Sequence, residues 1–286
     1  MVQTIGNPLS WGARVIGHAG SDVGAVTREL GGLDHAEPRL RHIGIEDLRE
    51  ALRRGAADFA AMRTDALVAA LIYPVAGLCL VALAYHRNLL PLAFPLLSGF
   101  ALVGPAAAVG LYEMSRRREA GESAGWADGF GVLASPRFGA ILALALAHLA
   151  VFTLWIIVAY WVFQMTMGPE VPGTPGAFLS EVLTTSGGWA MMAIGIPLGL
   201  AFAVLVLATS LVSFPMLLDR SVGLPLAILT SWRVVRANPG PALAWGAVVV
   251  VMLALGALPF LLGLAITLPV LGHATWHLYR RAVDFG

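Results

Sequence analysis

The sequence has no lysine, one cysteine and few charged residues. All eighteen basic residues are arginine, and charged residues make up 12% of the 286-residue chain, against roughly 25% in soluble domains. The lone Cys79 excludes a disulfide within the chain and a cysteine-based metal cluster. The net charge of +1 gives no overall attraction to nucleic acid, so we expect no nucleic-acid partner.

Long apolar runs are what the sequence has in place of charge. Hydrophobic residues account for 58% of the chain, and several runs approach the ~20 residues that a helix needs to cross a bilayer. We predict an all-α, multi-pass membrane protein with spans at 66–86, 89–113, 139–167 and 188–218 and two more within 242–279. As a single helix the last run would reach ~57 Å, nearly twice the hydrocarbon thickness, so we divide it near 258–260.

The arginines set the predicted topology. With the N-terminus in the cytoplasm, only Arg87 falls on the outer side, and the other seventeen lie on the inner side. This is the positive-inside pattern. It predicts a bacterial inner-membrane protein with both termini in the cytoplasm, and it supports dividing the last apolar run.

An internal repeat follows from the same pattern. An amphipathic helix precedes each apolar hairpin: at 45–62, around Trp126 to Leu133, and at 224–236. We predict a flexible cytoplasmic tail over 1–44 and a six-helix domain over 45–286, built from units at about 45–113, 114–218 and 219–281. The three hairpins would pack around a pseudo-threefold axis. The prolines Pro105, Pro215 and Pro269 recur in the even-numbered spans, where we expect bends or packing contacts. Span four exceeds the bilayer thickness, so it tilts, kinks at Pro197 or protrudes.

The first amphipathic helix leaves two interpretations open. Ile45, Leu48, Leu52, Phe59 and Met62 share one face, and Asp58 takes a polar face with Arg49, Arg53 and Arg54. The apolar face either rests on the inner leaflet or packs on the protein's own helices. Arginines on the cytoplasmic side are expected to contact lipid phosphates. These are Arg116, Arg117, Arg118, Arg233 and Arg236.

The stretch GFALVGPAAAVGLYEMSRRREAGE, Gly99 to Glu122, resembles the signature of an uncharacterised family of bacterial integral membrane proteins. That family is common in alphaproteobacteria, and members sometimes carry a cytochrome c oxidase subunit I label. The resemblance covers about 41–283, and 219–281 is also similar to six-span bacterial membrane proteins with an amphipathic helix before each hairpin. It implies no catalytic residue. An oxidase subunit needs more intramembrane histidines than His148, His273 and His277, so only an accessory place beside a respiratory complex remains, by association.

Those three histidines are the candidate polar sites. His273 and His277 lie four residues apart on one helix face, which suits a metal or haem. No acidic or cysteine partner is near them in sequence, and interfacial hydrogen bonding beside Trp276 and Tyr279 is the other interpretation. His148, near the middle of its span, is either functional or a neutral histidine bonded to a Ser or Thr across a helix interface. Its possible partners are Thr153, Gln164, Thr209, Ser210 and Ser213.

No paired titratable groups for acid–base catalysis stand out, and no carboxylate lies at depth in a span. We therefore expect a non-enzymatic protein with no catalytic residue, cofactor or metal, which acts as an accessory, assembly or scaffold component and binds membrane partners or lipid. A permease or channel for a small neutral or apolar substrate is the alternative.

Overall fold

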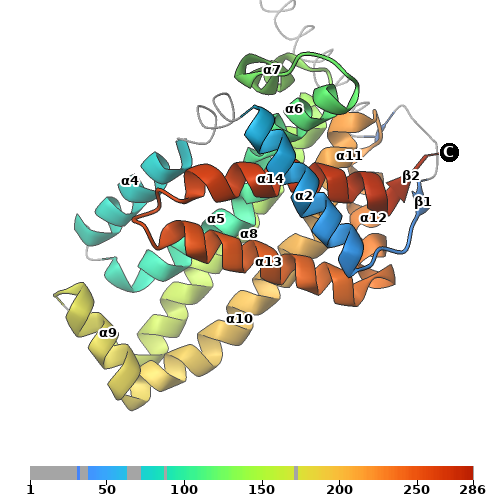
Figure 1. Cartoon of the computed structure of the whole chain (residues 1–286). Coiled ribbons are helices and arrows are strands. Elements are labelled where there is room, and N and C mark those ends of the chain that lie inside the picture. The colour runs from blue at the N-terminus through green and yellow to red at the C-terminus, as the bar shows by residue number, and fades with distance from the viewer. Residues whose placement is uncertain (1–30, 33–37, 63–71, 87–88, 171–172, 286) are drawn as a thin grey trace, which may run out of the picture.

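The structure, a computed structural model (Figure 1), describes residues 31–32, 38–62, 72–86, 89–170 and 173–285. Most of the predicted tail, the start of the first span and the turn at Arg87 lie outside these residues. The described part is mostly helical. Two short strands, β1 (Arg39–Leu40) and β2 (Val283–Asp284), pair antiparallel near the two ends of the described chain.

The helices occur in the predicted order. They are α2 (Ile45–Ala61), α4 (Ile72–His86), α5 (Ala93–Ala107), α6 (Val109–Glu119), α7 (Trp126–Gly131), α8 (Phe138–Thr166), α9 (Pro175–Thr184), α10 (Ser186–Ser210), α11 (Ser213–Asp219), α12 (Leu224–Ala237), α13 (Pro239–Ala257) and α14 (Leu264–Ala282). Single 3-10 turns, η1 (Leu90–Leu92) and η2 (Val132–Ala134), precede α5 and follow α7.

Three helical segments in the described chain are long and apolar enough to cross a membrane. They are Phe138–Thr166, Ser186–Asp219 and Pro239–Ala257. The first matches the predicted third span to within one residue at each end. In Figure 1, α8 and α10 project together to one side, and α9 joins them at the tip. The connection between the predicted spans 139–167 and 188–218 therefore contains a helix.

Proline and serine explain the break between α10 and α11. Pro215 has no N–H to donate to Leu211, and the helix is interrupted at Leu211 and Val212. Serine side chains replace the lost backbone bonds: Ser213 Oγ donates to the carbonyls of Thr209 and Ala227, and Ser231 Oγ accepts from the Val212 N–H. The long fourth segment therefore bends here, while the helix continues through Pro197.

The last apolar run turns at 258–263, so α13 and α14 are separate helices. Phe260 and Leu261 adopt left-handed backbone angles, with φ of 51° and 66°, a conformation that is rare for residues other than glycine. Leu258, Phe260 and Leu262 are exposed at this turn. An apolar turn of this kind suits a hydrocarbon or interfacial environment better than water.

Helix α2 crosses over α14 and packs against it (Figure 1). Gly55 lies so close to α14 that a Cβ added to it would stand 2.5 Å from the Ala274 nitrogen. Asn238 Oδ1 accepts from the Ile43 N–H, just before α2 begins. These contacts decide between the two interpretations of the amphipathic helix: it packs on the protein's own helices.

The predicted face of α2 was partly wrong. The buried stripe is Leu48, Ala51, Gly55 and Asp58, whereas Ile45 is 57% exposed. Asp58, which the sequence placed on a polar face, points into the protein. A buried carboxylate is tolerated only where hydrogen bonds and opposite charge replace water, and α6 and α14 supply both.

Candidate functional site

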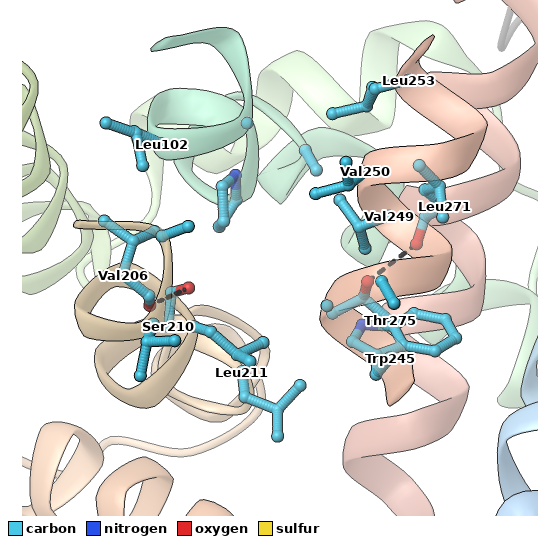
Figure 2. A pocket seen from close by; sticks show the side chains of 18 of the residues that line it. Leu102, Val206, Ser210, Leu211, Trp245, Val249, Val250, Leu253, Leu271 and Thr275 are labelled. Atoms are coloured by element: carbon cyan, nitrogen blue, oxygen red, sulfur yellow. Dashed lines mark hydrogen bonds between the residues drawn. The ribbon is translucent and has the colours of Figure 1, made fainter. Parts of the chain in front are cut away.

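An apolar cavity lies between α10 and α13 (Figure 2). Its volume is about 530 Å³, it is partly open, and α5, α6 and α14 complete its walls. Figure 2 shows Val206, Ser210 and Leu211 on one side of the space, facing Trp245 and Val250 on the other. The volume falls in the range of about 300–1,000 Å³ that is typical of small-molecule sites.

The few hydroxyl groups in the cavity wall do not make it polar. Ser210 Oγ donates to the Val206 carbonyl, and Thr275 Oγ1 donates to the Leu271 carbonyl, at 2.6 and 2.8 Å. Both are therefore satisfied within their own helices (Figure 2). The wall thus exposes mainly carbon atoms to a bound molecule, which favours a hydrocarbon chain over a polar solute.

A second assembly, which we call the Asp58 cluster, joins α2, α6 and α14 through Asp58, Ser115, Arg118, His273 and His277. Asp58 Oδ2 accepts from Ser115 Oγ at 2.6 Å and lies 2.8 Å from His277 Nε2. Ser115 Oγ is also 2.8 Å from His273 Nδ1. Arg118 donates to Asp58 Oδ1 at 2.9 Å and to the Ala57 carbonyl.

The cluster keeps Asp58 ionised although the residue is only 7% exposed. Burial by itself would raise the pKa of the Asp58 carboxyl, but hydrogen bonds from His277 and Ser115, with the charge on the histidines, lower that pKa below its usual value. A carboxylate held this way fastens α2 to α6 and α14.

The geometry of the cluster does not resemble a catalytic or metal centre. Ser115 is fully buried and donates its proton to a carboxylate rather than to a histidine. The Arg118 guanidinium already neutralises Asp58, and within the described ranges no three His, Cys, Asp or Glu residues form a possible metal-ligand set. None of its five members lines the cavity.

His148 is bonded to its own helix and to α10. Its Nδ1 lies 2.9 Å from the Leu144 carbonyl, and its Nε2 lies 3.2 Å from the Thr209 hydroxyl. The ring is 3% exposed and packs against Phe214. The histidine therefore joins α8 to the end of α10, at the point where the long fourth segment bends.

The three candidate prolines have different surroundings. Pro105 lies in the cavity wall, three residues before the break between α5 and α6. Pro215 is buried in the first turn of α11, and Pro269 is buried within α14. Only Pro105 could contact a guest in this cavity.

The aromatic residues beside the histidine pair bind carboxylates from other helices. Trp276 Nε1 donates to Glu119 at 2.9 Å, and the Tyr279 hydroxyl donates to Asp219 at 2.9 Å. One face of α14 is thus bonded to α2, α6 and α11 along its second half. The sequence indicated this polar face but not its partners.

The five arginines expected at lipid phosphates fall into two groups. Arg116 and Arg117 pair with Glu113, Arg117 also pairs with Asp128, and Arg118 pairs with Asp58. Arg233 and Arg236 on α12 are exposed and form no ion pair or side-chain hydrogen bond with another described residue. Contact with lipid phosphates stays a prediction for all five arginines. Arg233 and Arg236 suit it better, because their charges are not paired with another described residue.

Sequence reasoning missed Asp58 and Ser115 as site residues. Their partners lie 57 and 219 positions away in the chain, beyond any local period. One signal was present: Ala51 and Gly55 are small residues at the spacing that allows close helix contact, and Asp58 continues their face.

Comparison with known proteins supports the membrane assignment. Residues 93–219, from α5 to α11, match a family described as predicted integral membrane protein (DUF2189). The match includes the stretch 99–122, and it supports an uncharacterised membrane family. No curated protein and no solved structure matches the chain. The match and the three long apolar helical segments together indicate an integral membrane protein.

Proposed function

We propose that this chain is a non-enzymatic membrane protein that holds a lipid chain in the cavity between α10 and α13 and acts as an accessory or scaffold component. The cavity carries the proposal: about 530 Å³ of apolar space, partly open, stands between two of the helices able to cross a membrane. Lipid is the solvent around such helices, so a hydrocarbon chain is the guest most available to fill it.

The proposed topology has six spans in three hairpins, in a bacterial inner membrane, with both termini in the cytoplasm. The pairs α4–α5, α8–α10 and α13–α14 would be the hairpins. The arginine distribution and the turn at 258–263 support this arrangement. Labelling of a cysteine placed at Asp284 by a membrane-impermeant reagent tests it: protection in sealed, right-side-out cells is expected, and labelling from outside would contradict it.

Filling the cavity tests the function. Ala247 lines the cavity and is exposed to it. We expect Ala247→Trp to reduce the amount of phospholipid that stays bound to the purified protein in native mass spectrometry. Ala254→Trp is the matched control, because Ala254 is exposed two turns further along α13 and does not line the cavity. Equal lipid retention in both variants would contradict the proposal.

A partner role extends the proposal to a membrane complex. The supporting observation is the exposed aromatic and apolar surface of α8, with Tyr160, Trp161 and Met165 at 41%, 56% and 81% exposure. Recovery of a reproducible membrane complex after crosslinking in native membranes is expected. A respiratory complex is one candidate, by association alone, and a free monomer in crosslinked membranes would count against the partner role.

A permease for a small neutral or apolar substrate is the second candidate. It is favoured by Pro105 and the neighbouring helix break at Ala108, because both residues lie in the cavity wall where a hinge could open it. Flux of a neutral solute into proteoliposomes would support it. Solute flux equal to that of protein-free liposomes would leave lipid binding as the better explanation.

A further inference from the structure

Helix α12 presents an exposed stripe that combines apolar, aromatic and cationic side chains. The stripe consists of Leu229, Trp232, Arg233 and Arg236, which follow one another at steps of three, one and three residues and so share one helix face. Leu229 and Trp232 are 44% and 49% exposed. The opposite face, with Ala227, Thr230, Ser231 and Val234, is buried. Tryptophan beside arginine is typical of the bilayer interface.

The two arginines of this stripe differ from the arginines on the other described helices. Arginines of the other helices on the same predicted side are paired: Arg53 and Arg54 with Glu50, Arg116 with Glu113, and Arg280 with Glu119. Arg233 and Arg236 make no such pair among the described residues. Two neighbouring cations without acidic partners form a local positive charge that an external anion can neutralise.

The stripe and part of the cavity wall lie on consecutive helices. Helix α12 ends at Ala237, and α13 begins two residues later at Pro239. Leu243, Trp245 and Gly246 near the start of α13 line the cavity. At 1.5 Å per residue, these positions lie only about 7–12 Å along the helix from Asn238. A phosphate at the stripe and a hydrocarbon chain in the cavity can therefore belong to one molecule.

We propose that the guest is an anionic glycerophospholipid, whose headgroup phosphate binds Arg233 and Arg236 while one acyl chain occupies the cavity. This inference rests on the proposed lipid-binding function and adds the headgroup selectivity and its site. Charge complementarity selects the lipid: the stripe supplies two cations and the cavity an apolar slot. Trp232 would hold the glycerol region at the interface.

The expected preference for the anionic lipid follows from the binding free energy that one basic residue contributes near an anionic lipid surface. Each arginine should strengthen binding about fivefold, and both together on the order of thirtyfold. Salt should weaken it, because the screening length falls from about 10 Å at 0.1 M to about 3 Å at 1 M. The apolar part of binding should not weaken with salt.

The test is competition between two lipids with identical acyl chains. Full-length protein is equilibrated with equimolar dioleoylphosphatidylglycerol and dioleoylphosphatidylcholine, and the bound ratio is measured by native mass spectrometry. Wild type should prefer the anionic lipid. Arg233→Gln with Arg236→Gln should lower that preference about thirtyfold, and the lysine pair R233K with R236K should keep most of it. R49Q with R54Q is the control, because it removes the same charge from exposed positions of α2.

The outcomes separate the two proposals. If the glutamine pair keeps the wild-type lipid ratio, or if R49Q with R54Q lowers it equally, the headgroup site is wrong. If in addition Ala247→Trp still removes both lipids, the lipid-binding function stands without this site. If Ala247→Trp retains both lipids, the acyl chain does not bind in the cavity and both proposals are wrong. Loss of the preference at 1 M salt supports the site.

Discussion

The arm formed by α8 and α10 and the region where α2 covers α14 use apolar surface in opposite ways. In the most apolar window of Ser186–Asp219 only 6% of residues are buried in the protein. Helix α14 buries eleven of its 19 residues, and two of these are histidines. The arm leaves its apolar side chains for lipid to cover, so it needs almost no polar partner. Helix α14 is covered by protein, and Trp276, His277 and Tyr279 pair with carboxylates of other helices. Two of its buried polar atoms, Thr267 Oγ1 and His273 Nε2, have no hydrogen-bond partner among the described residues.

The largest loss of stability is expected when Asp58 is removed from its buried ion pairs. Asp58→Ala would leave His277 and Arg118 without their carboxylate, and removal of one partner from a buried pair typically costs about 3–5 kcal/mol. Unfolding in mixed detergent micelles, followed by tryptophan fluorescence, measures this loss. Glu46→Ala is the control: Glu46 also pairs with an arginine of α2, but its side chain is 81% exposed, so its removal should cost less than about 1 kcal/mol. Equal losses would contradict a structural role for the cluster.

A charge placed in the arm tests the other half of the comparison. Leu205 is 42% exposed near the middle of Ser186–Asp219 and does not line the cavity. If lipid covers this residue, Leu205→Arg should cost about 2.5–3.5 kcal/mol on an insertion scale. The measurement is the fraction of chains integrated into membrane vesicles during translation.

The control for the arm is Ile45→Arg, at an exposed position of α2. It should integrate like wild type, because α2 has access to water. If Leu205→Arg integrates equally well, the exposed apolar surface of the arm is not in the membrane interior.

The close crossing of α2 and α14 gives a somewhat smaller expected effect. Gly55→Leu would force the helices apart, because even a Cβ meets the Ala274 backbone, and overpacking typically costs about 1–3 kcal/mol. Faster proteolysis within α2 is the measurement. Ala56→Leu should leave the rate unchanged, since Ala56 is exposed. An undisturbed rate in Gly55→Leu would mean that the crossing is looser than described.

Lowering the pH is expected to have the smallest effect on the stability of the α2 contact. The pKa of Asp58 is below its ordinary value of 3.8 in the folded protein, so its contribution is fully present above about pH 4 and is lost as the pH falls through the folded pKa. His273, His277, Ser115 and Arg118 face the carboxyl. Proteolysis of α2 should therefore accelerate below pH 4 in wild type. In Asp58→Asn the rate should be higher at pH 5 and change less on acidification, and a parallel profile would contradict the linkage.

The sequence was sufficient for the elements whose signal is local. The run of apolar residues from Phe138 to Thr166 forms α8, and the length of the last apolar run predicted the turn between α13 and α14. The amphipathic helix expected at 224–236 is α12, which has Pro225 near its start and Asn238 at its end. Periodicity and turn residues act over a few positions, and this is the range in which sequence reasoning is reliable.

The rest depended on contacts between distant segments or on a cap that was overlooked. Burial of Asp58 follows from α6 and α14, which no period within α2 could show. The cavity depends on how α10 and α13 diverge, which hydropathy does not encode. Helix α9 had a local signal: the Thr174 hydroxyl accepts from Ala177, and Pro175 occupies the first turn.

The docking of α2 on α14 joins an early segment of the chain to one of the last to be made. Asp58 and His277 are 219 residues apart, which at about 5–20 residues per second is roughly 10–45 s of translation. Throughout that delay the carboxylate of the nascent α2 stays in water and its small-residue face stays bare. Helix α2 can dock only after α14 has been synthesised, so in a chain truncated before α14 the α2 segment would stay open to proteolysis.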